Sequence, residues 1–227
     1  IYTNRSLNII ADNGESIFSG NYVQSPDKKD QQAVYVENTF TKKELGFNED
    51  RTKYLFQLKP SKATLTLKSI NNGKIIFNDK ITGGTTTIVT NPFYIKDKQI
   101  HYTDENYNDT DVLTEHSSIP ELKITGDSSS VVQLNNDVEN LDISLSGTNL
   151  HLGARDNVLD GNNLDLQSGT LSMVNNQVGV ASLNNVTLSG NTNFIADVDL
   201  ANEQMDRITA TNYGTHQGNL NVVGMNL

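Results

Sequence analysis

The acidic stretch DENYNDTDVLTE, residues 104–115, contains the residue types of a calcium-binding loop. Its first, third, fifth and twelfth positions, where an EF-hand loop places oxygen ligands, are Asp104, Asn106, Asn108 and Glu115. The sixth position needs glycine for the turn but is Asp109 here, so an EF-hand is disfavoured. We interpret the stretch as a solvated acidic loop, with a looser calcium site as the alternative, and predict no other cofactor.

Aromatic side chains are the other candidates for a site. We select five as candidates for ligand binding, all in the first half of the chain: Phe40, Phe47, Tyr94, Tyr102 and Tyr107. Exposed aromatic rings stack on sugars or anchor protein contacts, and irregular segments are where such contacts usually lie. The alternative is that these rings fill a small core of their own.

Catalysis has little support from residue types and spacing. The chain has no cysteine, and its four histidines show none of the close spacings of a metal site. Asp197 and Asp199 are two residues apart, which places both carboxylates on one outward face of a strand. Outward acids more often keep a sheet soluble than catalyse reactions. We therefore predict that the chain is not an enzyme, with a polysaccharide lyase or hydrolase as a weaker alternative.

Composition narrows the range of partners. The 227 residues contain 17 Lys and Arg against 27 Asp and Glu, a net charge of −10. Binding to nucleic acid needs the opposite charge, so no nucleic-acid partner is expected. No apolar run reaches about 18 residues, so direct insertion into a membrane is not expected. The first residues, IYTNRSLNII, do not form a signal peptide, and we expect the chain to be part of a longer protein.

The chain divides near Pro120 into two parts of different composition. Residues 1–119 hold 14 basic and 15 acidic residues, whereas residues 120–227 hold 3 and 12. Of the 15 Phe and Tyr residues, 13 precede Pro120. The whole chain contains 30 Asn and 16 Gly, which favour tight turns. We expect binding features in the irregular first part.

The second part repeats a short unit: alternating apolar residues, a turn with Gly or Asn, and further alternating residues. Units begin at Leu122, Leu141, Leu164, Val186 and Ile208, which is a period of roughly 20 residues. Alternation predicts strands with one buried face, and a period of this length predicts a β-solenoid. The expected fold is all-β, a right-handed parallel β-helix (β-solenoid) whose coils stack about 4.8 Å apart.

The first part carries the same unit with two interruptions. Segments 7–23 and 65–81 match the repeat, and insertions follow at about 24–62 and 82–119. Both insertions are long for plain loops, which predicts hairpins or extra coils on the side of one continuous solenoid. A β-sandwich is the main alternative, but its strands should be longer and more aromatic. The pattern of a leucine-rich repeat is absent.

Three segments resemble the passenger domains of bacterial autotransporters, the type V secretion family. They are LTLKSINNGKIIFNDKI, NNVTLSGNTNFIADVDL and MDRITATNYGTHQGNLNVVGMNL. The last two contain the Leu-Ser-Gly strand at 188–190, Phe-x-x-Asp-x-Asp-Leu at 194–200, the Asp-Arg-Ile-Thr strand at 206–209, a turn at Gly218 and a final strand at 220–223. The resemblance covers residues 64–84 and 120–227.

This resemblance implies a right-handed parallel β-helix displayed on the bacterial surface and anchored by a C-terminal outer-membrane barrel outside this sequence. Many such passengers are adhesins, so the implied partner is a protein or glycan on a host cell, in matrix or on another bacterium. The Gly-Asp-Ser-Gly motif of the protease members is absent. A stalk that holds another domain away from the membrane is the alternative function.

Overall fold

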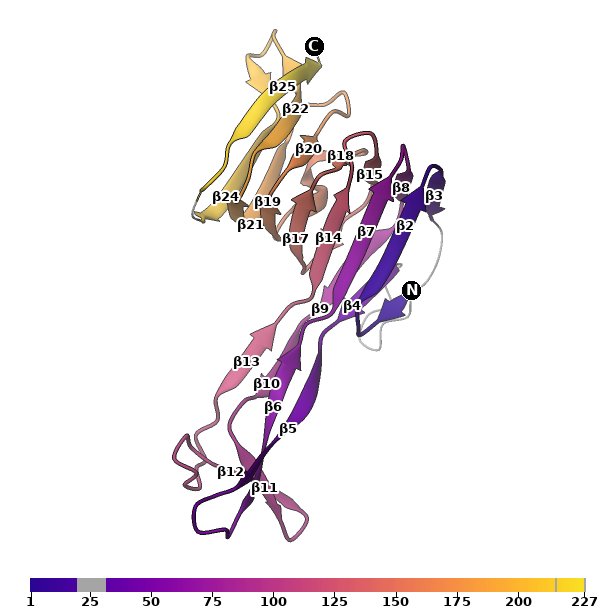
Figure 1. The fold of residues 1–227 in the computed structure, drawn as a ribbon. Helices are drawn as coiled ribbons and strands as arrows, with labels where there is room; N and C mark the ends of the chain where they lie inside the picture. The colour runs from indigo at the N-terminus through magenta and orange to yellow at the C-terminus, as the bar shows by residue number, and fades with distance from the viewer. Residues whose placement is uncertain (20–31, 215, 227) are drawn as a thin grey trace.

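The computed structural model describes residues 1–19, 32–214 and 216–226. These residues form an all-β protein with one short 3-10 helix, η1 (Asp156–Leu159). Three sheets make up a body, and two insertions project from it as a long arm (Figure 1). We use "arm" for residues 39–61 and 86–118, and "body" for the other described residues.

The body contains two long sheets and one short sheet. The first long sheet contains, in spatial order, β2 (Leu7–Asp12), β7 (Thr64–Ile70), β14 (Glu121–Gly126), β17 (Asp142–Ser146), β19 (Asn163–Leu166), β21 (Val180–Leu188) and β24 (Arg207–Tyr213). The second contains β3 (Glu15–Phe18), β8 (Lys74–Phe77), β15 (Val131–Leu134), β18 (Asn149–Leu152), β20 (Gly169–Ser172), β22 (Thr192–Asp199) and β25 (Leu220–Asn226), with β23 (Gln204–Met205) antiparallel to β22. The short sheet contains β1 (Tyr2–Thr3), β4 (Gln32–Glu37), β9 (Lys80–Gly84) and β16 (Val138–Glu139).

Strands of the first long sheet pair in parallel, and from β14 to β21 the paired residues keep a nearly constant spacing along the chain. Leu122 lies opposite Ile143, Ile143 opposite Leu164, and Leu164 opposite Val186. Consecutive strands of the chain alternate between the sheets, so each return to a sheet adds one strand beside the previous one. The described part of segment 7–23 pairs with segment 65–81 in the expected register, with Leu7 opposite Leu65 and Phe18 opposite Phe77.

Two of the predicted repeat boundaries are wrong. Leu141 lies at the corner before β17, where its N–H donates to the side chain of Asn162, and Ile143 occupies the position opposite Leu122. Ile208 pairs with Ala181 rather than with Val186, because β21 is nine residues long and begins at Val180. A buried leucine at a corner and a buried leucine on a strand have the same sequence pattern, so alternation alone does not separate them.

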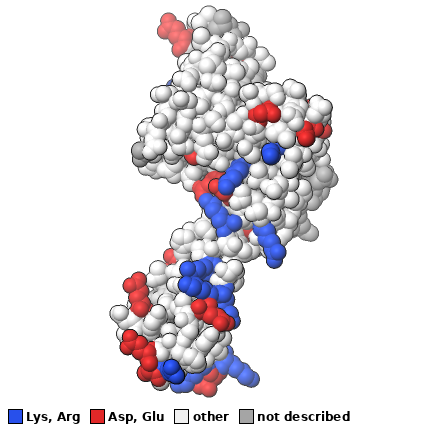
Figure 2. Space-filling view, viewed as in Figure 1, with Lys and Arg blue, Asp and Glu red and all other residues white. Residues whose placement is uncertain are grey.

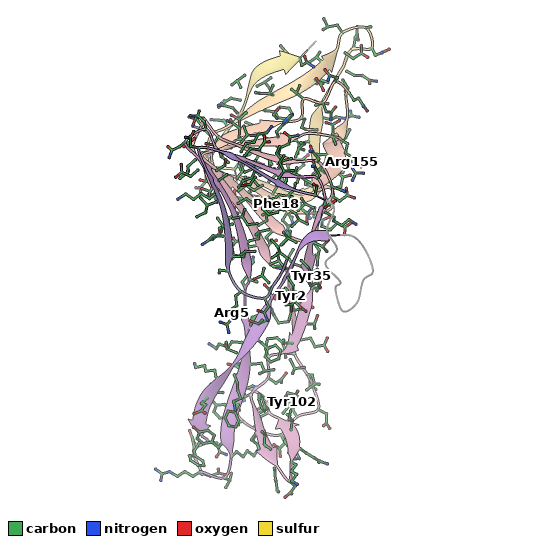
Figure 3. The ribbon with its side chains drawn as sticks, turned by 90° about the vertical axis from the view of Figure 1, so that its right-hand side faces the viewer. Tyr2, Arg5, Phe18, Tyr35, Tyr102 and Arg155 are labelled. Atoms are coloured by element: carbon green, nitrogen blue, oxygen red, sulfur yellow. The ribbon has the colours of Figure 1, made fainter. Side chains whose placement is uncertain are left out.

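Apolar side chains from the two long sheets fill the interior of the body. Inward positions alternate with outward polar positions, as in Leu65 and Leu67 of β7 or Ile143 and Leu145 of β17. They join in one continuous core that extends from Ala11 to Ala196. At the N-terminal end Phe18, which is labelled in Figure 3, lies in the body, and its ring stacks on Phe77 with centroids 4.5 Å apart. Burial of this apolar area is the main source of stability of the body.

Asparagine is abundant because it serves the corners. Asn13, Asn71, Asn72, Asn140 and Asn176 adopt positive φ values, a geometry that asparagine tolerates in turns. Asn162 is buried at a corner, where its side chain accepts the N–H of Leu141 and donates to the carbonyl oxygen of Leu159. The asparagine content therefore reflects the many turns of the body.

Candidate functional site

The two insertions leave the body at adjacent corners and join in one arm. The first insertion forms the hairpin β5 (Thr39–Phe47) and β6 (Tyr54–Ser61), between β4 and β7. The second forms β10 (Thr86–Val89), β11 (Phe93–Lys96), β12 (Gln99–Tyr102) and β13 (Glu115–Ser118), between β9 and β14. Because β4 pairs with β9 and β7 with β14, both insertions start and end side by side (Figure 1). Both insertions contain the hairpins that were predicted. The strands Gln32–Glu37 and Lys80–Gly84, near the predicted starts of the insertions, belong to the body. Residues 24–31 of the first predicted insertion lie outside the described residues.

A four-stranded sheet, in the order β12-β11-β6-β5, forms the outer part of the arm. The two insertions meet in it through Phe93 of β11, which pairs with Phe56 of β6. The buried apolar residues of the arm are Leu55, Ile88, Phe93 and Tyr94, and none of them belongs to the core of the body. The arm therefore has a small core of its own.

Asn38 joins both insertions at the base of the arm. Its side chain is 3% exposed, accepts the N–H of Ala63 at 2.7 Å and donates to the hydroxyl of Ser118 at 3.0 Å. The carbonyl oxygen of Asn38 accepts the hydroxyl of Thr86 at 3.1 Å. One buried residue thus connects both ends of the first insertion to both ends of the second, and loss of its side chain leaves the Ala63 N–H and the Ser118 hydroxyl without this partner.

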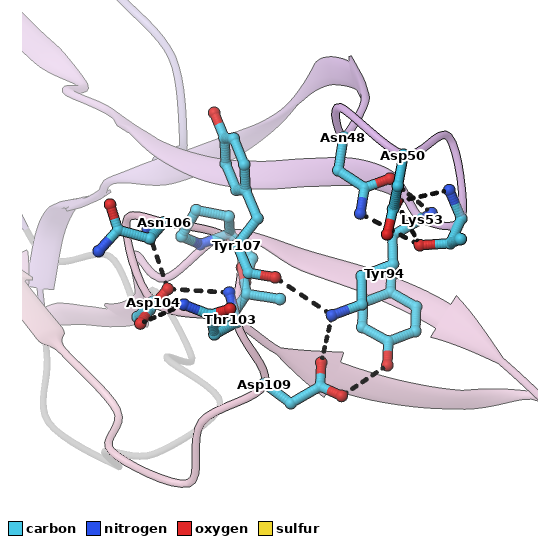
Figure 4. Close-up of polar contacts among 12 residues, drawn as sticks. Asn48, Asp50, Lys53, Tyr94, Thr103, Asp104, Asn106, Tyr107 and Asp109 are labelled. Carbon is cyan, nitrogen blue, oxygen red and sulfur yellow. Dashed lines mark hydrogen bonds and ion pairs between the residues drawn. The ribbon is translucent and has the colours of Figure 1, made fainter.

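A second polar cluster connects the insertions near the outer end of the arm (Figure 4). The ammonium of Lys53 donates to the carboxylate of Asp109 at 3.0 Å and to the carbonyl oxygen of Tyr107 at 3.1 Å. The hydroxyl of Tyr94 donates to the same carboxylate at 3.2 Å, and Lys53 also lies over the Tyr94 ring. The hydrogen bond from Lys53 lowers the pKa of Asp109, so the cluster keeps its ion pair at neutral pH.

The five predicted aromatic residues all lie on the arm but in different environments. Phe40 and Phe47 are 54% and 62% exposed, and Tyr107 is 38% exposed. Tyr94 is only 9% exposed and belongs to the core of the arm, and Tyr102 is half-buried beside Phe93 (Figure 3). Phe40, Phe47 and Tyr107 are therefore available for contact, whereas Tyr94 follows the alternative prediction of an internal core.

The predicted calcium residues do not converge on one point in the loop. Asp104 and Asn108 lie together, but one oxygen of Asp104 accepts the N–H groups of Asn106 and Asn108, each at 2.9 Å. Glu115 lies in β13 opposite Val89. Nowhere in the described part of the chain do three or more His, Cys, Asp or Glu side chains gather as metal ligands would. The geometry is that of an acidic turn stabilised by its own N–H groups.

Exposed aliphatic side chains beside the aromatic ones were not selected from the sequence. Ile95 and Ile100 are cross-strand neighbours in the β11–β12 hairpin and are 58% and 56% exposed. Val112 and Leu113 follow nearby in the chain and are also exposed. A hollow of about 320 Å³ is lined by Ile100, His101, Tyr102, Asp109, Thr110, Asp111 and Leu113. The hairpin turns at Asp97 and Lys98, both at positive φ, which is the geometry of a two-residue hairpin turn.

Large exposed hydrophobic side chains occupy only three regions of the described chain. The first terminal strands carry Ile1, Tyr2, Ile10 and Ile17; the arm carries Phe40, Phe47, Tyr54, Ile95, Ile100, Tyr107, Val112 and Leu113; and the last strands carry Leu200, Met205, Tyr213, Val222, Val223 and Met225. Residues 114–199 expose none. The arm is thus the region away from the two ends of the body that presents apolar side chains to solvent.

Charged groups are mixed rather than segregated around the arm. Figure 2 shows basic side chains along the arm and where it meets the body, with acidic side chains between them. At this junction Lys62 pairs with Asp142 at 2.6 Å, and Lys123 pairs with Glu121 at 3.2 Å. The net negative charge of the chain therefore does not give the arm a single-sign surface.

A buried acidic corner lies near the last strands of the body and was missed from the sequence. Asp156, Asp197 and Asp206 are all buried, at 7%, 3% and 1% exposure. The predicted outward position of Asp197 is wrong: its carboxylate accepts the N–H groups of Asn175 and Gln177 and the side-chain amide of Asn226. Asp199, by contrast, stabilises a surface turn by accepting the N–H of Ala201.

The three carboxyl groups of this corner differ in acidity. Burial and the nearby Asp206 carboxylate raise the pKa of Asp156 to about 6. Burial also raises the pKa of Asp206. Burial acts in the same direction on Asp197, but hydrogen bonds from Asn226 and from backbone N–H groups outweigh it and lower its pKa. The corner is held together by N–H donors and is sensitive to protonation.

Comparison with known proteins adds no relative: no family model, no curated protein and no solved structure matches this chain. Among the residues that the structure describes, no helix is long and apolar enough to cross a membrane.

Proposed function

We propose that this chain is a segment of a surface-displayed bacterial adhesin, and that its arm makes the contact with another surface. The body is interpreted as a right-handed parallel β-helix of the autotransporter passenger type. Parallel pairing at a regular offset along the chain and a continuous apolar core support this interpretation. The partner would be a protein or glycan on a host cell, in matrix or on another bacterium.

The observation that carries the proposal is the distribution of exposed apolar side chains. Apart from the two ends of the body, they gather on the arm among the described residues. Exposed apolar side chains that lie next to one another mark interaction sites, and Ile95 and Ile100 of the arm are such neighbours. The proposal includes no enzymatic activity: in the acidic corner, the carboxylates of Asp197 and Asp206 accept backbone N–H groups.

Removal of the arm tests the proposal. An armless variant would join Tyr35 to Thr64, and Thr82 to Glu121, each through an Asn-Leu turn. Residues 140–141 form that turn at the equivalent corner of the body, so the sheets keep their register. Saturable binding to epithelial cells, matrix proteins or other bacteria should disappear with the arm. Binding that survives would assign the contact to the body.

A point variant gives a finer test with a matched control. Ile95→Ser with Ile100→Ser removes two exposed aliphatic side chains from the arm, and Ile10→Ser with Ile17→Ser removes two from the body at nearly equal exposure, 55% each. The arm variant should weaken binding and the body variant should not. Equal effects would indicate general loss of apolar surface rather than a contact made by the arm.

A stalk is the second candidate function, and one observation favours it. Residues 114–199 combine a continuous buried core with no large exposed hydrophobic side chain. That surface suits a spacer that avoids contacts. A stalk would bind no surface with or without its arm, and core substitutions would lower only its display on the cell.

A further inference from the structure

Strand β5 is an open edge of the arm. It is nine residues long, the longest strand of the arm, and it pairs with β6 on one side only within the described residues. An unpaired edge presents N–H and C=O groups to any strand that can align with it. In natural proteins, lysines and bulges on an edge strand reduce unwanted pairing with other strands. β5 has both, with Lys42 and Lys43 on the strand and a bulge at Gly46.

The backbone direction of β5 follows from its partner. Phe40 lies opposite Pro60, which has no N–H, so the two residues do not exchange a pair of hydrogen bonds. Alternation along an antiparallel pair then directs the N–H and C=O of Phe40 and Lys42 toward the open edge. The same alternation directs those of Lys43 toward β6.

Four side chains of β5 share one face. Phe40, Lys42 and Glu44 alternate along the strand, and the bulge between Glu44 and Gly46 brings Phe47 to the same face. Contacts agree with this assignment: Lys42 lies over the ring of Phe56, and Tyr54 of β6 donates to Glu44 at 2.8 Å. Phe47 contacts the same Tyr54 ring, with centroids 4.9 Å apart.

This face is complementary to itself. A second β5 can be aligned antiparallel about a two-fold axis at Lys43. Lys42 then lies opposite Glu44 of the second copy. Because the bulge between Glu44 and Gly46 takes up one extra residue, Phe40 lies opposite Phe47 of the second copy. The symmetry repeats both pairs, which gives two aromatic pairs and two ion pairs across the axis. Both aromatic residues are more than half exposed in the single chain. Lys43 faces its own copy on the opposite face, which opposes the association.

We propose that β5 is a docking surface for a second copy of this chain, through antiparallel edge-to-edge pairing of the two arms. Charge and aromatic complementarity favour a second copy as the partner. A strand that lacks an acidic residue and aromatic residues at these spacings would match the edge of β5 less well. β5 runs from the base of the arm outward, so antiparallel pairing places the two bodies at opposite ends. This inference goes beyond the proposed attachment to foreign surfaces and does not depend on it.

Charge exchange tests the proposed pairing in the purified chain. Sedimentation velocity over a concentration series should show a monomer–dimer equilibrium. Lys42→Glu and Glu44→Lys should each weaken it by at least about tenfold, since each places like charges opposite one another. The double variant should recover dimerisation, because its charges are again opposite. A chain that is monomeric throughout the series, or single variants that dimerise like the parent, would overturn the proposal.

A cysteine placed on the axis gives an independent readout, because the chain has no other cysteine. Lys43→Cys should form a disulfide-linked dimer under mild oxidation, since the two residues would face each other in a close, non-hydrogen-bonded pair. Lys98→Cys, an exposed position in the β11–β12 turn, is the control and should remain mostly monomeric. Equal cross-linking of both variants, or none for Lys43→Cys, would contradict the pairing. Neither experiment includes a foreign surface, so this result is separate from the test of adhesion.

Discussion

The arm is expected to lose its structure without unfolding of the body when its own core is weakened. Leu55 is 1% exposed and packs in the arm, outside the core cluster of the body. Leu55→Ala removes buried methyl groups and leaves a cavity, which costs about 2–5 kcal/mol in a well-packed core. The free energy of opening of the arm should fall by that amount. Backbone amides of β5 and β6 should then exchange about 30-fold to a few thousand-fold faster.

Leu145→Ala is the matched control, because Leu145 is fully buried in the core of the body. The same chemical change there should lower the free energy of unfolding of the body and speed exchange in the long sheets. Hydrogen exchange measured by mass spectrometry separates the two regions. Equal acceleration of body and arm by Leu55→Ala would refute a separate arm core, and no acceleration would refute the packing assigned to Leu55.

Three further predictions concern polar groups. Asn38→Ala should destabilise the base of the arm by about 1–3 kcal/mol, because the Ala63 N–H and the Ser118 hydroxyl lose their partner. Hydrogen exchange at β10 and β13 would report it, and unchanged exchange would contradict the role of Asn38. Lys53→Met should leave Asp109 without its ion pair and the carbonyl oxygen of Tyr107 without its donor, and so loosen loop 103–110. Faster proteolysis of this loop while the body resists would report it, and equal resistance of the loop in parent and variant would argue against the role of Lys53. Because the pKa of Asp156 is raised in the folded state, the folded state binds this proton more tightly than the unfolded state. The melting temperature should therefore rise as pH falls from about 7.5 to about 5.5, and Asp156→Asn should reduce this dependence. An identical pH profile for the variant would exclude Asp156 as its source.

Short strands and their stacking period were predictable because each has a local signal. Alternation in segments such as Leu65 to Leu67, and turns with Asn or Gly, reveal strand and corner without tertiary information. Register was less predictable. Leu141 and Ile208 look like strand openings, yet the corner at Asn162 and the long strand β21 decide their places, and both depend on neighbouring strands.

The site was predictable only as a region. Aromatic residues and segment lengths pointed to the insertions, but the pairing of Phe56 with Phe93 joins segments far apart in the chain. That pairing decides that Tyr94 is buried while Phe40 and Phe47 are exposed. The inward position of Asp197 was equally inaccessible, because its partners lie on other strands and loops.

The most direct test of the central claim is a parallel binding measurement with the purified chain and its armless variant. Labelled protein would be titrated onto epithelial cells, immobilised matrix proteins and other bacteria, after circular dichroism shows that both chains are folded. The proposed function predicts saturable binding by the intact chain and none by the armless chain on the same surface. Equal binding by both chains, or binding by neither, would contradict the assignment of contact to the arm.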